Sequence, residues 1–190
     1  MDEERSGSGS ARERDEIDSG WASWIAQERL SNARESRSKE RWLRQQAGEE
    51  ATLTGLLIDL AERRVDAVLT TKAGRHSGRL VGVGRDFCVV SAAHGTTLVS
   101  TAAVLTVTSA DLAGTVAAGD RPARLPQRMA DALADLAAER APVRLRMSDG
   151  QHLTGALVAA GVDLVSLRVE GATRTIVHVA LAAIESCASL

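Results

Sequence analysis

The side chains that could carry acid–base or metal chemistry are few and scattered along this sequence of 190 residues. The four histidines are His76, His94, His152 and His178. His76 and His152 follow short turn sequences at nearly the same place in two similar segments. Neither has a Cys, His or acidic neighbour at the spacing of metal ligands. We therefore expect no metal site.

Two short stretches begin like functional motifs without completing them. Gly82-Val-Gly84 opens like a dinucleotide-binding fingerprint, but the third glycine is missing and a strand-like run follows. Asp86 and Asp163 each follow a glycine, and we expect turn residues that bond to their own backbone. A lone carboxylate lacks the partner that general acid–base catalysis needs. We expect no catalytic residue, no cofactor and no enzymatic activity.

The two cysteines, Cys88 and Cys187, stand in or near apolar runs. Two cysteines are too few for a disulfide framework, so buried, unreactive thiols in a reducing compartment are expected. The start of the chain, residues 1–10, is polar and acidic, unlike a signal peptide. Polar residues interrupt the long uncharged run of residues 87–110, which therefore predicts strands and no membrane span. These features favour a cytoplasmic protein.

Four basic residues gather in one stretch whose counterparts, 76 or 77 residues later, are uncharged. This asymmetry makes a phosphate-binding face conceivable, although ordinary solvated surface is the more common role of such charges. Single-strand binders also need aromatic platforms, and the only aromatic residue after position 50, Phe87, is expected in the core. The candidate nucleic-acid contacts are Lys72, Arg75, Arg79 and Arg85.

The N-terminal quarter of the chain differs in composition from the rest. Residues 1–50 hold 12 acidic and 9 basic residues and all three tryptophans. Residues 1–20 are typical of a disordered acidic tail. Residues 21–47 have helical spacing and alternating charge, which indicates either a solvated helix or one that docks on a partner. The candidate docking residues are Trp21, Trp24 and Trp42.

The remainder of the chain contains an internal repeat. The helical segments that end at Arg63 and Arg140 have similar sequences, and short strands follow each of them. In these strands Ala67, Leu69 and Thr71 of the first copy, and Val143, Leu145 and Met147 of the second, occupy the inward positions of a period-two pattern. Ala73-Gly74 in the first copy and Asp149-Gly150 in the second occupy the same position in a predicted hairpin turn. The sequence pattern of each copy therefore predicts one helix followed by about five short strands.

This order of elements resembles the Sm-like small barrel, a relative in shape of the SH3-like barrels. Gly78, Gly82 and Gly84 fit the sharply bent second strand of such a barrel. The tandem arrangement resembles a group of bacterial double-barrel proteins. The Asp and Asn pattern and the Arg/Lys-Gly pair of RNA-binding Sm proteins are missing, so their RNA pocket does not carry over.

The sequence thus predicts a mainly β protein with helices (α+β): two tandem helix-plus-five-strand small barrels preceded by a charged helix. The expected parts are a tail (1–20), a Trp-bearing helix (21–47), barrel one (48–108), a linker (109–125) and barrel two (126–190). Small barrels without catalytic residues commonly serve as binding platforms. We expect a non-enzymatic interaction or adaptor protein with a protein partner. The alternative is a nucleic-acid-binding regulator that uses the basic face of barrel one, and self-association is left open.

Overall fold

The computed structural model describes residues 38–40, 42–43, 45–46, 48–110, 119, 121–169 and 175–190. The chain divides into two compact units, Met1–Gln46 and Ala47–Leu190. The described residues between 38 and 49 are helical, and all are exposed. Trp21 and Trp24 lie outside the described residues. The second unit holds every strand of the described chain.

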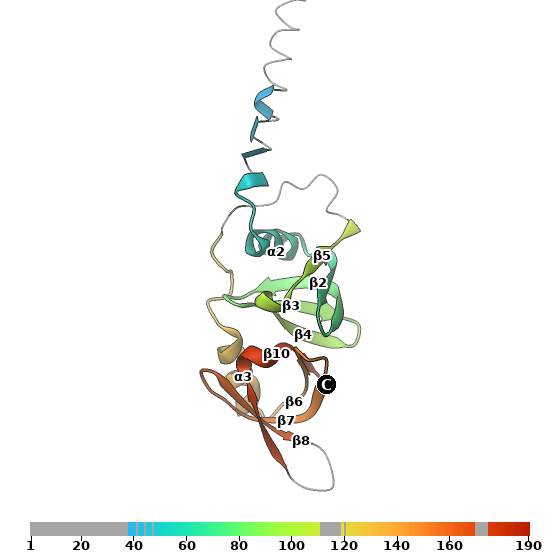
Figure 1. Ribbon diagram of the computed structural model, residues 1–190, viewed down its shortest axis with the longest axis vertical. Coiled ribbons are helices and arrows are strands. Elements are labelled where there is room, and N and C mark those ends of the chain that lie inside the picture. The colour runs from blue at the N-terminus through green and yellow to red at the C-terminus, as the bar shows by residue number, and fades with distance from the viewer. Residues whose placement is uncertain are drawn as a thin grey trace, which may run out of the picture. The chain divides into compact units, whose positions relative to one another are not determined.

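The first half of this second unit contains a helix and five strands (Figure 1). The helix begins after Thr52, whose hydroxyl accepts a hydrogen bond from the Gly55 N–H at 2.9 Å, and it ends at Arg64, which has a left-handed φ of 52°. A 3-10 turn, η1 (Thr101–Ala103), precedes the last strand. The elements are α2 (Leu53–Arg63), β1 (Asp66–Thr71), β2 (Gly74–Val83), β3 (Phe87–Ala92), β4 (Gly95–Ser100) and β5 (Thr106–Thr108).

The second half has the same order of elements. Its helix follows Arg128, whose N–H donates to the carboxylate of Asp131 at 2.8 Å. A 3-10 turn, η3 (Leu181–Ala183), again precedes the last strand. The elements are α3 (Met129–Ala138), β6 (Pro142–Met147), β7 (His152–Ala160), β8 (Leu164–Val169), β9 (Ile176–Ala180) and β10 (Ile184–Ser189).

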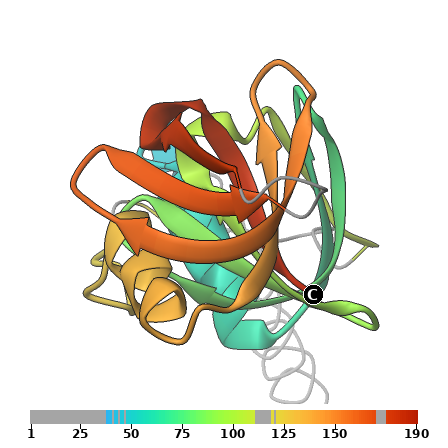
Figure 2. The ribbon, with the colours of Figure 1, turned by 90° about the horizontal axis from the view of Figure 1, so that it is seen from below.

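The predicted architecture of two tandem small barrels is wrong. The ten strands of the described residues form one antiparallel sheet in the order β5-β1-β2-β3-β4-β10-β6-β7-β8-β9, and within these residues the sheet is not closed. The edge of β4 pairs with β10 of the other half and not with β5 of its own half. Period-two patterns specify which face of a strand is buried, but they do not specify which strand lies beside it. The strands curve strongly around each core (Figure 2).

Two glycines allow the curvature. A Cβ at Gly78 would overlap the carbonyl oxygen of Ser91, and a Cβ at Gly155 would overlap that of Arg168. β2 and β7 each contain a register shift a few residues later, between Leu80 and Gly82 and between Leu157 and Ala159. A bulge at this place bends the strand, so that one long strand serves two sides of a curved sheet.

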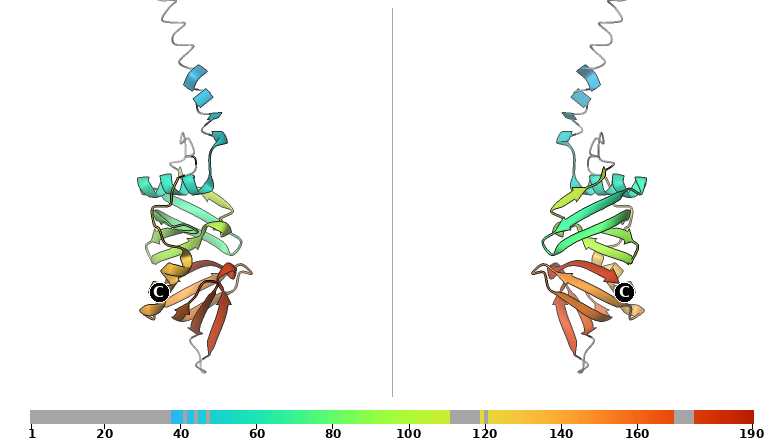
Figure 3. Two further views of the ribbon diagram at one scale, coloured as in Figure 1. Left: turned by 90° about the vertical axis from the view of Figure 1, so that its left-hand side faces the viewer. Right: turned by 90° about the vertical axis from the view of Figure 1, so that its right-hand side faces the viewer.

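The core contains two hydrophobic clusters, and the boundary between them does not coincide with the predicted linker. The first contains residues of α2 and β1–β4, among them Leu57, Leu69 and Leu80, which are fully buried. The second contains residues of α3 and β6–β10, but Phe87 of β3 belongs to it as well, and Val89 and Leu98 pack against it. The outer face of β3 and β4 is thus covered by the second half. α2 packs against β2 and α3 against β7 (Figure 3).

The segment before α3 is also attached to the first half. The N–H of Leu125 donates to the carbonyl of Val83, and the N–H of Arg85 donates to that of Gln127. Arg121 and Arg124 both bind the carboxylate of Glu62 on α2, at 2.8 and 2.7 Å, and these bonds lower its pKa. The end of the predicted linker therefore runs along the first half.

Several local predictions are confirmed. Ala67, Leu69 and Thr71 are buried, as are Val143 and Leu145, whereas Met147 is half-buried. Phe87 is 1% exposed and lies in the core.

In the described part of the chain, no helix is long and apolar enough to cross a membrane.

Candidate functional site

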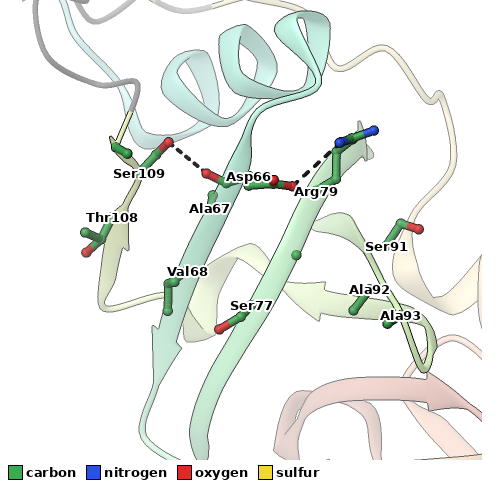
Figure 4. Close-up of a pocket in the computed structure, with 12 residues that line it drawn as sticks. Asp66, Ala67, Val68, Ser77, Arg79, Ser91, Ala92, Ala93, Thr108 and Ser109 are labelled. Atoms are coloured by element: carbon green, nitrogen blue, oxygen red, sulfur yellow. Dashed lines mark hydrogen bonds and ion pairs between the residues drawn. The ribbon is translucent and has the colours of Figure 1, made fainter.

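A groove of about 580 Å³ lies on the first half of the sheet (Figure 4). It runs over β5, β1 and β2 to the end of β3. Small side chains line most of it, including Ser77, Ser91, Ala92 and Ala93. A shallow floor of small residues on an open sheet face leaves room for atoms of a partner.

The pairing of the strands places the polar wall of the groove on one face. Asp66 lies opposite Arg79, and Arg79 lies opposite Ser91 on its other side. Val68 pairs with Ser77 and with Thr108 in the same way. Directly opposed residues point to the same side of a sheet. The face that these residues share is the one turned away from the first hydrophobic cluster.

One ion pair crosses the groove. The carboxylate of Asp66 lies 3.7 Å from Nε of Arg79, and the two side chains are 77% and 57% exposed. Such an exposed pair contributes little stability, and a partner can displace it at small cost. Ser109 Oγ donates to the backbone carbonyl of Asp66 at 2.8 Å and holds the end of β5 against β1. Asp66 and Arg79 thus offer one charge of each sign to a bound molecule.

The structure brings together two of the four basic residues named from the sequence. Arg75 and Arg79 are exposed and alternate along β2, so they share the face of the groove. Lys72 lies in the turn between β1 and β2, next to a smaller cavity of about 180 Å³. Arg85 lies beyond the other end of β2, where its N–H bonds to Gln127. The four do not form one patch.

Of the three tryptophans, the structure describes Trp42 alone. It is 62% exposed, and its neighbour Leu43 is 49% exposed. An indole with this exposure is available for docking, which is the role predicted from the sequence. That role stays a prediction.

A polar cluster that the sequence did not reveal lies between the two halves. Glu185, which is 4% exposed, accepts a hydrogen bond from the N–H of Ala73 at 2.8 Å. Nη1 of Arg146 donates a hydrogen bond to the backbone carbonyl of Ala73 at 3.2 Å. The peptide groups of the β1–β2 turn are therefore held by two charged side chains of the second half. The one sequence signal was an acidic residue inside the apolar run of β10.

His76 lies beside this cluster. Its Nε2 atom is buried and has no hydrogen-bond partner. Burial lowers the pKa of His76, the nearby Arg146 lowers it further, and Glu185 partly opposes them. The imidazole therefore stays neutral to a lower pH than an exposed one. A neutral, partly buried histidine of this kind belongs to the packing between the halves.

His76 and His152 lie one residue apart in the strand registers of the two halves. His76 pairs with Leu69 of β1. The counterpart of Leu69 in β6 is Leu145, which pairs with Leu153, whereas His152 pairs with Arg146. A shift of one residue places a side chain on the other face of a sheet, and His152 is accordingly exposed. Within the described ranges, no three His, Cys, Asp or Glu side chains are grouped so that they could hold a metal ion.

Asp86 lies in a turn, as expected, but its carboxylate does not bond to its own backbone. Oδ1 accepts a hydrogen bond from the N–H of Met129, the first residue of α3, at 2.7 Å. The two cysteines are free and buried, as predicted. Burial raises the pKa of both Cys88 and Cys187 to about 12, so neither thiol is a nucleophile at neutral pH.

A scan of the chain against protein-family models gave no match, and a search of curated proteins gave none either. The resemblance to Sm-like proteins therefore stays an expectation drawn from the sequence.

Proposed function

We propose that this chain is a non-enzymatic interaction protein that binds a protein partner in the groove over β5, β1 and β2. The observation that carries the proposal is the groove of about 580 Å³ on an open sheet face, lined by small side chains and a weak ion pair. Specific binding sites are concave and combine apolar surface with a few polar groups that fix orientation. Asp66 and Arg79 would supply those polar groups.

A second contact surface is proposed in the unit Met1–Gln46. Exposed Trp42 and Leu43 supply large apolar side chains there, and tryptophan is over-represented among the residues that dominate binding energies. Trp21 and Trp24 belong to the same predicted docking helix. A chain with one contact surface in each unit has the organisation of an adaptor. We place this adaptor in the cytoplasm, where free thiols such as Cys88 and Cys187 remain reduced.

Site-specific photo-crosslinking tests the groove. A photoreactive phenylalanine at Ser77, in the groove, is expected to cross-link to a partner in cells of the source organism. The same residue at Asp149, which is exposed in the turn between β6 and β7, is the matched control. The additional change Arg79→Ala should reduce the Ser77 product, because it removes a polar anchor. Equal products from both positions, or none from Ser77, would contradict the proposal.

The alternative is nucleic-acid binding by the basic face of the first half. It is favoured by one observation, the position of Arg75 and Arg79 on the same exposed face of β2. Fluorescence anisotropy with mixed RNA and DNA probes over a salt series separates the alternatives. Phosphate contacts make affinity fall steeply with salt, and the double change of Arg75 and Arg79 to Ala would then reduce the slope by about 2. An absence of binding at low salt removes the alternative.

A further inference from the structure

A second cavity lies between the two halves of the sheet, separate from the groove. Its volume is about 180 Å³, and residues of the β1–β2 turn, η1, the β6–β7 turn, η3 and β10 line it. None of the described residues lines both this cavity and the groove. An inference about the cavity therefore goes beyond the proposed partner-binding function.

The walls of this cavity come from corresponding positions in the two halves. The first residue after β1 and the first residue after β6 both line it, and so do the middle residues of η1 and η3. The second residue after each of these 3-10 turns lines it as well. The pairs are Lys72 and Ser148, Ala102 and Ala182, and Leu105 and Glu185.

The two halves differ in charge at two of these pairs. The first half supplies the cation Lys72 where the second half has Ser148, and the second half supplies the anion Glu185 where the first half has Leu105. Lys72 and Glu185 do not form an ion pair with each other. The cavity thus has one positive and one negative group, and they come from different halves.

Glu185 is the buried charge of this cavity. It is 4% exposed and occupies the extra position of a bulge in β10, between Ile184 and Ser186. A bulge turns a side chain out of the alternating pattern of its strand. Here it brings the carboxylate to the cavity and to the N–H of Ala73, which donates to Oε2 at 2.8 Å.

The other oxygen of this carboxylate is unsatisfied. Oε1 has no hydrogen-bond or ion-pair partner among the described residues, and Arg146 bonds to the carbonyl of Ala73 and not to Glu185. Oε1 is not enclosed, because in the described part of the chain Nε2 of His76 is the only enclosed side-chain polar atom without a partner. A buried carboxylate without an opposite charge is costly, and a cation in the cavity would remove that cost.

The other polar groups of the cavity suit an anion. Lys72 is exposed, and within the described ranges neither its ammonium nor the hydroxyls of Ser100 and Ser148 have a partner. An ammonium and two hydroxyls supply the hydrogen-bond donors that a carboxylate accepts. Cation-binding and anion-binding groups therefore line the same small space.

We propose that this cavity binds a small α-amino acid as its zwitterion. The ammonium of the ligand would donate to Oε1 of Glu185, and its carboxylate would accept from Lys72 and the two serines. A volume of about 180 Å³ holds about six water-sized groups, which is the size of an amino acid with a short side chain. Glu185 is the only carboxylate among the described lining residues, whereas Ca²⁺ and Mg²⁺ take several oxygen ligands. The charge of the cavity therefore favours an amine over a metal ion.

Isothermal titration calorimetry of the full chain tests the class of ligand. The probes are glycine, L-alanine and L-serine, with ethylamine and propionate as matched compounds that lack the carboxylate or the ammonium. At least one amino acid should bind, and ethylamine and propionate should bind at least about tenfold more weakly, because each loses one charged contact. No binding of the three amino acids at millimolar concentrations overturns the inference. Ethylamine or propionate binding as tightly as the amino acids also contradicts it.

Two variants test the residues. Glu185→Gln and Lys72→Gln should each weaken amino-acid binding about ten- to a hundredfold. A glutamine at position 185 can still accept from the Ala73 N–H, so the β1–β2 turn stays attached. Arg144→Gln, at an exposed position in β6, removes the same charge as Lys72→Gln outside the cavity and is the matched control. Unchanged affinity in both cavity variants contradicts the inference, and so does an equal loss in the control.

Circular dichroism and thermal melting show whether each variant is folded. If Glu185→Gln does not fold, Ala102→Leu replaces it, because this exposed residue of η1 lines the cavity and a leucine there fills it. Ala102→Leu should abolish binding without a change in either charge, and unchanged binding would contradict the inference. These titrations need no protein partner, so the photo-crosslinking experiment at Ser77 can fail without affecting their result.

Discussion

At the scale of the residue, His76 links the stability of the sheet to pH. Its Nε2 is buried without a partner, and its pKa is lowered from the ordinary value of 6.5. Below pH 6.5 the unfolded chain therefore takes up a proton before the folded chain does. The His76 contribution to stability is complete above pH 6.5 and is lost as the pH falls toward the lowered value.

His76→Leu is expected to reduce this loss of stability on acidification. Leu153 occupies the corresponding position in the second half, so a leucine suits this place in the sheet. The change also removes a buried atom without a hydrogen bond, which should raise the free energy of unfolding by about 1 kcal/mol. Urea unfolding above and below pH 6.5 measures both effects. His152→Leu, on the exposed face, is the control, and an unchanged pH dependence in His76→Leu would contradict the account.

Single residues were predicted from the sequence where their own type decided the outcome. Phe87 and the two cysteines are buried because large or weakly polar side chains without a polar partner favour the core. Asp86 was placed in a turn, but its bond to Met129 depends on a helix that begins 43 residues later. Glu185 and Arg146 were missed for the same reason, because their partner is a distant backbone group.

At the scale of the element, the bend of β7 depends on the absence of a side chain at Gly155. A Cβ there would overlap the carbonyl oxygen of Arg168 in β8, so β7 and β8 would have to separate. We expect Gly155→Ala to lower the free energy of unfolding by about 2–3 kcal/mol. Gly161→Ala, where the nearest atom is Leu164 O at 3.7 Å, should change it by less than about 0.5 kcal/mol. Chemical denaturation compares the two, and equal effects would show that crowding at Gly155 is not the cause.

The start of α3 depends on a side chain from the other half. Asp86→Ala removes the acceptor of the Met129 N–H and should cost about 1–2 kcal/mol, as the loss of a helix cap does. The measurement is urea unfolding. Asp163→Ala is the matched control and should be nearly neutral, because Asp163 is exposed. A loss of the same size in both variants would assign the effect to the turn and not to the helix.

The elements themselves were largely readable from the sequence. The alternation of apolar and polar residues predicted the inward residues of β1 and β6. Turn-forming residues predicted the hairpins at Ala73-Gly74 and Asp149-Gly150. The linker was expected to end at residue 125, but α3 begins only at Met129. Residues 125 and 127 form backbone hydrogen bonds with Val83 and Arg85 at the end of β2. Local patterns are strong inside an element and weak at its ends.

At the scale of the whole molecule, the two halves depend on each other. Phe87 is buried in the second cluster, and Val89 and Leu98 pack against it. A fragment of residues 48–108 would expose all three side chains and the edge of β4. We expect this fragment to lack a cooperative thermal transition by circular dichroism, whereas residues 48–190 should retain one. Cooperative melting of the shorter fragment would show that the first half is independent.

The pairing of β4 with β10 is the feature that the sequence could not supply. Both halves carry similar strand patterns, so an edge strand fits a neighbour from its own half or from the other one equally well by pattern alone. The groove was missed for a related reason. Its lining comes from β1, β2, β3 and β5, and the small residues there have no distinctive spacing along the chain.

The hydrogen bond between the Ala73 N–H and the Glu185 carboxylate also affects the rate at which the chain folds. The two residues are 112 positions apart, and Thr96 and Ser189, which join β4 to β10, are 93 apart. Contacts that close such long loops form late, because their entropy cost precedes any gain from pairing. The β1–β2 turn therefore receives its final hydrogen bonds only after the last strand is in place, and slow folding follows from the topology itself.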